Sequence, residues 1–292
     1  MEETFSTGLI ASPEDIRDIP LSAIAPIPVR IPESMPPIFD LEILDQNGYP
    51  ACVGFSCAAI KQDRELREKN NIVFDGKWIY DECKKIDGMP NVKGTYFRTG
   101  MEVLYKFGAK PINGGDPARF KIGSYAILDK IDANEIKKAI LLYGSVLAGF
   151  RGSNAGWKSE IVRKPNAGEA VWQHAVALVG YNKNYFIVHN SWGKDKGNNG
   201  MFLVPIDYLP FEVWVVMTDL PTPLPGTIGW SAIQTIDGKT KYIVKGMTTT
   251  NLNLRESPNG KILKVIPRWT AVLVLPEDEV SMGGYIWNKV QI

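Results

Sequence analysis

Residues 45–55 of the chain are Asp45-Gln46-Asn47-Gly48-Tyr49-Pro50-Ala51-Cys52-Val53-Gly54-Phe55. Two further blocks follow far downstream, Trp172-Gln173-His174-Ala175-Val176-Ala177-Leu178-Val179-Gly180-Tyr181 and His189-Asn190-Ser191-Trp192-Gly193. Together they offer a sulfur, a base, an amide to orient the base and an amide donor for an oxyanion. The blocks and their order predict a thiol nucleophile site.

The first block places Cys52 at the start of a predicted helix that runs from about Cys52 to about Lys69. Pro50 suits such a start, because the N–H that proline lacks would be unpaired there. A thiol attacks as its thiolate, and the partial positive charge of a helix N-terminus favours an anion. The sequence therefore makes Cys52 the candidate nucleophile.

The other blocks supply partners for that sulfur. The chain has only two histidines, and His174 is the candidate base. Asn190 can hold the imidazole in place, and Trp192 would shield that hydrogen bond from water. The Gln46 side chain and the Cys52 backbone N–H would stabilise an oxyanion, where losing one donor typically costs about 2.7–4 kcal/mol. His189 is expected to be a strand residue without a chemical role.

Composition excludes several classes of protein. The 292 residues include 33 basic and 32 acidic side chains, a balance that does not favour a nucleic-acid or acidic-membrane partner. No apolar run approaches the roughly 20 residues that span a bilayer, and the acidic N-terminus does not resemble a signal peptide. We expect no membrane association. Three possibilities stay open: the chain stays in the cytosol, it is exported by a route other than a signal peptide, or a leader was removed earlier.

The chain has only three cysteines, Cys52, Cys57 and Cys83, and this low, odd number argues against a disulfide framework. Cys57 and Cys83 are expected in the core, with a Cys57–Cys83 bridge as the alternative. Four closely spaced soft ligands for a structural zinc are missing, and we expect neither metal nor cofactor. The glycine-rich segment 193–200 lacks Walker spacing and is predicted to be a turn.

Proline-rich segments indicate where the predicted domains begin and end. Residues 1–37 hold seven of the twenty prolines and are predicted to form an extended surface arm, with residues 15–18 in a solvated turn. The main domain covers residues 38–219, and a proline-rich linker covers 220–228. Residues 229–292, which contain the hairpin signal Asp237-Gly238, are predicted to form a small all-β barrel.

Secondary-structure signals change along the main domain. Predicted helices at 76–86, 98–107 and 136–143 precede β-rich runs at 146–150, 175–181, 185–189 and 201–205. Asp132 is the expected N-cap of the last helix. Helices followed by strands indicate an α+β domain with two segregated halves, and a site built from both would lie in the cleft between them.

The three blocks resemble those of papain-like (C1-type) cysteine peptidases over roughly residues 38–217. The match rests on Gln46-x5-Cys52, on His174-Ala175-Val176-x2-Val179-Gly180-Tyr181 and on Asn190-Ser191-Trp192-Gly193-x6-Gly200. Bacterial and viral members are similar in the segments from Trp78 to Gly108. The resemblance implies a two-lobed fold, a helical lobe and a β-barrel lobe with a cleft between, and a Cys52–His174 ion pair.

The same resemblance implies further residues. Asn190 would orient His174, Gln46 would line the oxyanion hole, and Gly94 and Thr95 would bind substrate backbone along one edge. The sequence departs from the cathepsin signature at Tyr49 and Val53, which replace the first Cys and the aromatic residue. We expect no long inhibitory propeptide of the kind that lysosomal relatives carry, since residues 1–37 are too short to be one, although they could still lie across the cleft.

The C-terminal segment resembles a bacterial SH3-type (SH3b) domain in Leu252-Asn253-Leu254-Arg255-x2-Pro258, in Val265-Ile266-Pro267 and in residues 286–290. Short β-barrels share such patterns. The resemblance implies a cell-wall or protein ligand for this domain.

The predicted function is hydrolysis of peptide bonds in a protein or peptide substrate through a Cys52 thioester. Two alternatives stay open. One is a peptidoglycan peptidase or amidase that the SH3b domain targets to the cell wall. The other is a binding protein whose papain-like half is inert.

Overall fold

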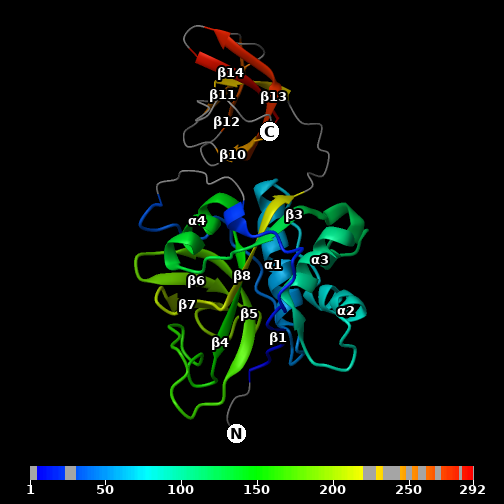
Figure 1. Cartoon of the computed structure of the whole chain (residues 1–292), viewed down its shortest axis with the longest axis vertical. Helices are drawn as coiled ribbons and strands as arrows, with labels where there is room; N and C mark the ends of the chain where they lie inside the picture. Colours follow the sequence, from blue (N-terminus) through cyan, green and yellow to red (C-terminus); the bar gives the residue numbers. More distant parts are fainter. Residues whose placement is uncertain are drawn as a thin grey trace. The chain divides into compact units, whose positions relative to one another are not determined.

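The computed structural model describes residues 5–23, 31–219, 228–232, 244–247, 252–255, 261–266, 271–282 and 285–291. The chain divides into two compact units, Met1–Thr222 and Pro223–Ile292. Each unit is described by itself below, and Figure 1 shows the course of the chain.

Helices of the first unit lie mostly before its strands in the sequence, as predicted. They are α1 (Cys52–Arg67), α2 (Gly76–Ile86), α3 (Phe97–Lys106) and α4 (Ala133–Tyr143), with 3-10 turns at Leu21–Ala23 and Pro117–Phe120. The predicted N-cap of α4 is confirmed, because the Asp132 side chain accepts from the N–H groups of Asn134 and Glu135. Helix α1 ends two residues before the predicted Lys69, whose φ of 66° is left-handed.

The strands of the first unit form two sheets. A short parallel pair joins β1 (Leu9–Ile10) to β2 (Thr95–Tyr96). The large sheet is antiparallel, with the strand order β3-β8-β4-β5-β6-β7 and with β3 and β7 at its edges. Its strands are β3 (Ile122–Ile127), β4 (Val146–Gly152), β5 (Trp172–Tyr181), β6 (Tyr185–His189), β7 (Met201–Pro205) and β8 (Glu212–Asp219).

Both faces of the central strands are buried, so their sequences are nearly continuous apolar runs. Leu147, Ala175 and Ala177 belong to a core cluster with residues of α1, α2 and α3. Alternate residues, such as Val146 and Val176, belong to a second cluster with residues of α4. Figure 1 shows α1, α2 and α3 on one side of the sheet and α4 on the other. The α+β arrangement with segregated helices matches the prediction.

Strands β3 and β8 were not predicted from sequence. The run Val213–Val216 in β8 is buried throughout and shows no alternation of apolar and polar residues. The secondary structure of such a run is hard to predict, because periodicity alone does not separate a buried strand from a buried helix segment.

The N-terminal arm differs from the predicted surface segment. Phe5 and Leu9 are 8% and 5% exposed, and each packs into a core cluster. Asp15 and Arg17 do form an exposed ion pair in a turn, as expected. Asp18, however, pairs with Arg98 of α3. The described part of the arm therefore packs into the domain and does not merely lie on it.

The second unit is all-β in its described residues. Six strands form one sheet in the order β10-β13-β14-β9-β11-β12, and all its pairings are antiparallel. They are β9 (Ile228–Ala232), β10 (Val244–Met247), β11 (Leu252–Arg255), β12 (Ile262–Ile266), β13 (Ala271–Met282) and β14 (Tyr285–Gln291). The predicted hairpin turn at residues 237–238 lies outside the described residues, and the SH3b assignment stays a prediction.

The described residues contain neither a membrane-spanning helix nor a cluster of metal ligands. No helix among them is long and apolar enough to cross a bilayer. No group of three or more His, Cys, Asp or Glu side chains there is placed to hold a metal ion.

Candidate active site

Cys52 is the first residue of α1, the position that the sequence predicted for a nucleophile. Ala51 precedes it as N-cap and makes no side-chain capping bond, and the first turn holds no acidic residue. The partial positive charge of the helix end is therefore not offset by a side chain of that turn. Burial raises the pKa of the Cys52 thiol, and nearby backbone groups that include those of Val53 and Ala175 oppose that rise.

His174 comes from the opposite half of the domain, where β5 pairs with β4 and β6. Cys52 and Ala175, the residue directly after His174, belong to the same core cluster, so the start of α1 packs beside β5. The structure thus brings together a helix N-terminus and a strand that are far apart in sequence. Figure 1 shows α1 and β5 side by side.

A hydrogen bond fixes the His174 ring. Its Nε2 lies 2.7 Å from Oδ1 of Asn190, which also accepts the Ser191 N–H at 2.8 Å. Since Oδ1 can only accept, Nε2 must carry a proton. The other ring nitrogen, Nδ1, is buried and has no hydrogen-bond partner in the described residues.

Aromatic rings enclose His174. The Trp192 ring is stacked on the imidazole at 4.4 Å with an angle of 21° between planes, and Trp157 and Trp172 meet it edge-on. Trp192 therefore lies against the imidazole itself. Only Trp192 was singled out from the sequence, because Trp157 is distant along the chain and lies in no recognised block.

Gln46 is tied to the block that follows β6. Its backbone N–H donates to Ser191 O at 2.9 Å, and its Oε1 accepts from Ser191 Oγ at 2.7 Å. Its Nε2 donates to Tyr49 O at 2.6 Å. An amide nitrogen carries two hydrogens, so one N–H of Gln46 remains to donate elsewhere. Ser191 was missed as a positioning residue, although it stands inside the quoted Asn190-Ser191-Trp192 block.

Gly94 and Thr95 form an edge that already binds backbone. The Thr95 N–H donates to Gly8 O at 2.9 Å, and β2 pairs with β1 of the arm. Gly94 has a φ of 90°, which favours glycine, and a Cβ there would lie 2.3 Å from Gly8 O. The edge that was expected to bind substrate backbone thus binds the chain's own arm.

Comparisons with known proteins bear on this site. Residues 96–208 match the model of the papain family cysteine protease. The chain carries a papain-like C1 peptidase domain.

Individual relatives of this peptidase domain are distant in sequence. An uncharacterized peptidase C1-like protein of Acanthamoeba polyphaga mimivirus is 27% identical over 216 residues, covering 60% of this chain and 70% of that protein. Cathepsin B-like CP3 of Giardia intestinalis is 27% identical over 191 residues, covering 56% of this chain and 64% of that protein.

Solved structures share the fold of the papain-like domain. The cysteine protease xylellain from Xylella fastidiosa aligns with a TM-score of 0.64 at 24% identity, covering 74% of this chain and 97% of that one. The procathepsin B S9 of Trypanosoma congolense aligns with a TM-score of 0.57 at 18% identity, covering 74% and 86%. The predicted papain-like α+β fold is therefore confirmed.

Burial shifts the pKa of both candidate groups, Cys52 and His174, toward favouring their neutral forms. It raises the pKa of the Cys52 thiol to about 12, against the opposing hydrogen bonds from backbone groups. It also lowers the pKa of His174 to about 4, although the hydrogen bond to Asn190 opposes that shift. Both shifts oppose charge separation between the two groups, and the Cys52–His174 ion pair stays a prediction.

The remaining cysteines of the peptidase domain are core residues. Cys57 and Cys83 are fully buried and free, so the alternative of a disulfide between them is wrong. Burial raises the pKa of both thiols, which leaves them protonated and unreactive at neutral pH.

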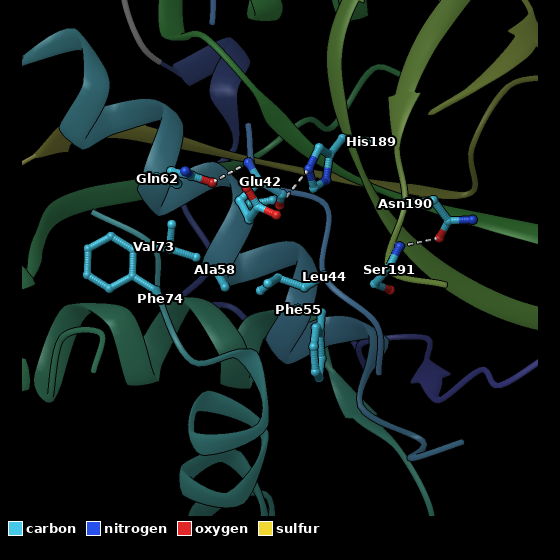
Figure 2. A pocket seen from close by; sticks show the side chains of 11 residues that line it. Glu42, Leu44, Phe55, Ala58, Gln62, Val73, Phe74, His189, Asn190 and Ser191 are labelled. Carbon is cyan, nitrogen blue, oxygen red and sulfur yellow. Dashed lines mark hydrogen bonds between the residues drawn. The ribbon is translucent and has the colours of Figure 1, made fainter. Parts of the chain in front are cut away.

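A small pocket lies next to Asn190 and Ser191 in the peptidase domain. Phe55 and Ala58 of α1 line it together with His189, which Figure 2 shows hydrogen-bonded to Glu42. Neither Cys52 nor His174 lines this pocket. His189 thus lines a pocket separate from the candidate nucleophile, in keeping with its predicted lack of a chemical role.

Proposed function

We propose that the domain hydrolyses peptide bonds through a thioester on Cys52, with His174 as the acid and base. The observation that carries the proposal is the Asn190 hydrogen bond to His174 Nε2, which leaves Nδ1 as the nitrogen able to take a proton. The shared core cluster of Cys52 and Ala175, the residue after His174, supports the same pairing.

The reaction begins with transfer of the thiol proton from Cys52 to His174 Nδ1. The sulfur forms a bond to the substrate carbonyl carbon, and the carbonyl π electrons move to its oxygen. When the tetrahedral intermediate collapses, the C–N bond breaks and His174 gives its proton to the leaving amine. Water, deprotonated by His174, then attacks the thioester, which releases the acid and restores the thiol.

Two donors would stabilise the oxyanion of each intermediate. One is the backbone N–H of Cys52, at the N-terminus of α1. The other is the free N–H of Gln46, whose amide is held by Ser191 and by Tyr49 O. Donors fixed before the reaction cost no reorganisation when charge develops. Trp192, stacked on His174, limits the access of water to the ring and to its bond with Asn190.

The direct test replaces Cys52 by Ala and follows hydrolysis of unfolded protein or peptide substrates. The proposal predicts loss of all activity above background, with retention of the folded structure. A Cys57→Ala variant is the matched control, because this buried thiol has no place in the mechanism. Activity that survived in the Cys52→Ala chain would refute the assignment.

The role of the second unit stays a proposal as well. Its described strands support an all-β unit, and the sequence resemblance favours an SH3b domain that binds a cell-wall or protein ligand. Full-length Cys52→Ala protein should then co-sediment with purified bacterial cell walls. Loss of wall turbidity with the wild type would favour the peptidoglycan peptidase over general proteolysis. A folded wild type that hydrolyses neither substrate would favour the inert alternative.

A further inference from the structure

Side chains of α2 hold the candidate substrate edge, which we define as Gly94 and Thr95. Gly94 has no side chain, and the buried Thr95 hydroxyl has no hydrogen-bond partner in the part of the chain that the structure describes. The Gly94 N–H donates to the Tyr80 hydroxyl at 3.3 Å, and Lys84 Nζ donates to Gly94 O at 3.0 Å. Both polar groups of the Gly94 backbone are therefore bound to α2.

Asp87 holds the Lys84 ammonium group in turn. Its Oδ2 accepts from Lys84 Nζ at 2.6 Å, and its Oδ1 accepts from the Met89 N–H at 2.8 Å. The Asp87 side chain is fully buried, and that of Lys84 is 16% exposed. Because water and salt screen a pair in this position only weakly, the two side chains keep each other in place. Lys84 thus reaches Gly94 from a fixed position.

Tyr80 also contacts the helix that carries the candidate nucleophile. A Cβ on Gly54 would lie 2.7 Å from the Tyr80 backbone nitrogen and 3.0 Å from the Tyr80 Cβ. Gly54 lies in the first turn of α1, which begins at Cys52. The Tyr80 backbone therefore packs on this turn while its hydroxyl accepts from Gly94. One residue thus connects the nucleophile helix to the substrate edge.

The substrate edge binds extended backbone in this structure. The Thr95 N–H donates to Gly8 O at 2.9 Å, and β2 pairs with β1 in parallel register. Phe5 of the same segment stacks on Trp192, so Trp192 and the edge lie toward opposite ends of it. In the proposed reaction the leaving amine lies toward His174 and Trp192. The acyl part of a substrate therefore extends toward Thr95.

We propose that Tyr80 and Lys84 are positioning residues for substrate binding, which hold the substrate edge at a fixed distance from Cys52. The inference rests on the proposed function of the site, since it requires a substrate that lies along the edge. Neither side chain touches the reacting atoms. The two residues therefore determine how well a long substrate binds and leave the chemical step unchanged.

Two esters of the same amino acid separate binding at the edge from the chemical step. The short ester is the N-acetyl amino-acid methyl ester, and the long ester carries two further residues on its amino side. Tyr80→Phe removes the hydroxyl that accepts from Gly94 and keeps the rest of the side chain. For the long ester, KM should rise about two- to tenfold at unchanged kcat, as expected for one lost hydrogen bond. Both constants for the short ester should stay at their wild-type values.

A double variant, Lys84→Met with Asp87→Asn, tests the second contact without leaving a buried charge unpaired. Asparagine keeps an oxygen that can accept from the Met89 N–H. KM for the long ester should rise by about tenfold or more, because a hydrogen bond from a charged donor is the stronger kind. Lys85→Met and Tyr105→Phe are the matched controls, since the Lys85 side chain is 64% exposed and Tyr105 is 48% exposed. Both controls should keep the wild-type KM.

Hydrogen exchange of the Thr95 amide, followed by NMR, reports the edge without any substrate, because this N–H donates to Gly8 O. It should be faster in Tyr80→Phe and in the double variant than in the wild type and the two controls. Unchanged exchange in both variants would overturn the proposal, whatever the kinetic constants.

The kinetic results separate positioning from a merely structural role. A wild-type KM for the long ester in both variants, even with a lower midpoint of urea unfolding, would overturn the proposal. An equal rise of KM for the short and the long ester would overturn it as well. Faster Thr95 exchange in variants of a chain that hydrolyses neither ester would support the positioning of the edge and refute the proposed function instead.

Discussion

Oδ1 of Asn190 lies 2.7 Å from Nε2 of His174, and the Trp192 ring covers the imidazole at 4.4 Å. The hydrogen bond decides which nitrogen is protonated in the neutral ring, and the stacking keeps the ring from turning. With Nε2 occupied, the ring can exchange a proton only through Nδ1. The Asn190 side chain therefore sets the tautomer on which the proposed proton transfers depend.

Replacing Asn190 by Ala should lower kcat by at least about tenfold and change KM little, because the ring loses its orientation while substrate contacts remain. The measurement is steady-state hydrolysis of a peptide substrate by the wild-type and Asn190→Ala chains. A variant whose KM rises while kcat is unchanged would place Asn190 in substrate binding.

Gln46→Glu removes the amide donors but keeps an oxygen that can accept from Ser191 Oγ. We expect kcat to fall about 10²–10³-fold, the usual effect of losing one oxyanion donor. Gln62→Glu is the matched control, since Gln62 lies in α1 and lines the pocket of Figure 2. Equal losses in the two variants would indicate a general effect of buried charge.

Stability should fall as the solution becomes acidic. Burial lowers the pKa of both His174 and His189 from 6.5 to about 4. Between pH 6.5 and 4 the unfolded chain binds protons that the folded chain does not. Each histidine therefore lowers the free energy of unfolding by up to about 1.4 kcal/mol for every unit by which the pH falls. Below pH 4 both states are protonated, and this loss ends.

The variant His189→Gln isolates one of these contributions, because glutamine does not titrate. Urea unfolding measured from pH 4 to 7 should show a shallower dependence on pH than in wild type, by up to half of the histidine contribution. A pH dependence identical to that of wild type would show that folding does not lower the pKa of His189.

The contact between α1 and α2 depends on Gly54. A Cβ at this position would lie 2.2 Å from Gly76 O and 2.7 Å from Tyr80 N, both backbone atoms of α2. Gly54→Ala should therefore destabilise the domain by about 1–3 kcal/mol, even though alanine favours helix. Denaturant unfolding measures this loss, and Lys85→Ala at an exposed α2 position is the control. A stabilised Gly54→Ala chain would contradict the packing.

Much of this fold was accessible from sequence because local rules agreed with the structure. The bounds of α2, β6 and β7 match the prediction, and the N-cap at Asp132 was expected. Cys52, His174 and Asn190 were singled out as candidates because a helix start, a strand and an amide that orients the base each have a recognisable chemical pattern. Their spatial relationship comes from sheet register and helix packing, which no single segment contains.

The arm shows what sequence could not supply. Its prolines indicated an extended segment, and the possibility that it crossed the cleft was left open. The burial of Phe5 and Leu9 depends on surfaces formed by Trp192 and Gly149, residues more than a hundred positions away. The sequence gives no sign that Gly8 is constrained, because the constraint comes from the backbone of Pro50, which a Cβ on Gly8 would meet. Long-range packing, and not local propensity, determines these contacts.

The most direct test of a Cys52 nucleophile is to trap the covalent intermediate. A peptide ester is mixed with the wild-type chain and the reaction is stopped in acid during turnover. The attachment point of the acyl group is then mapped by mass. The account predicts one acyl group, bound as a thioester to Cys52 and absent from Cys57 and Cys83. Turnover with no acyl group on Cys52, or with the acyl group on another residue, would contradict it.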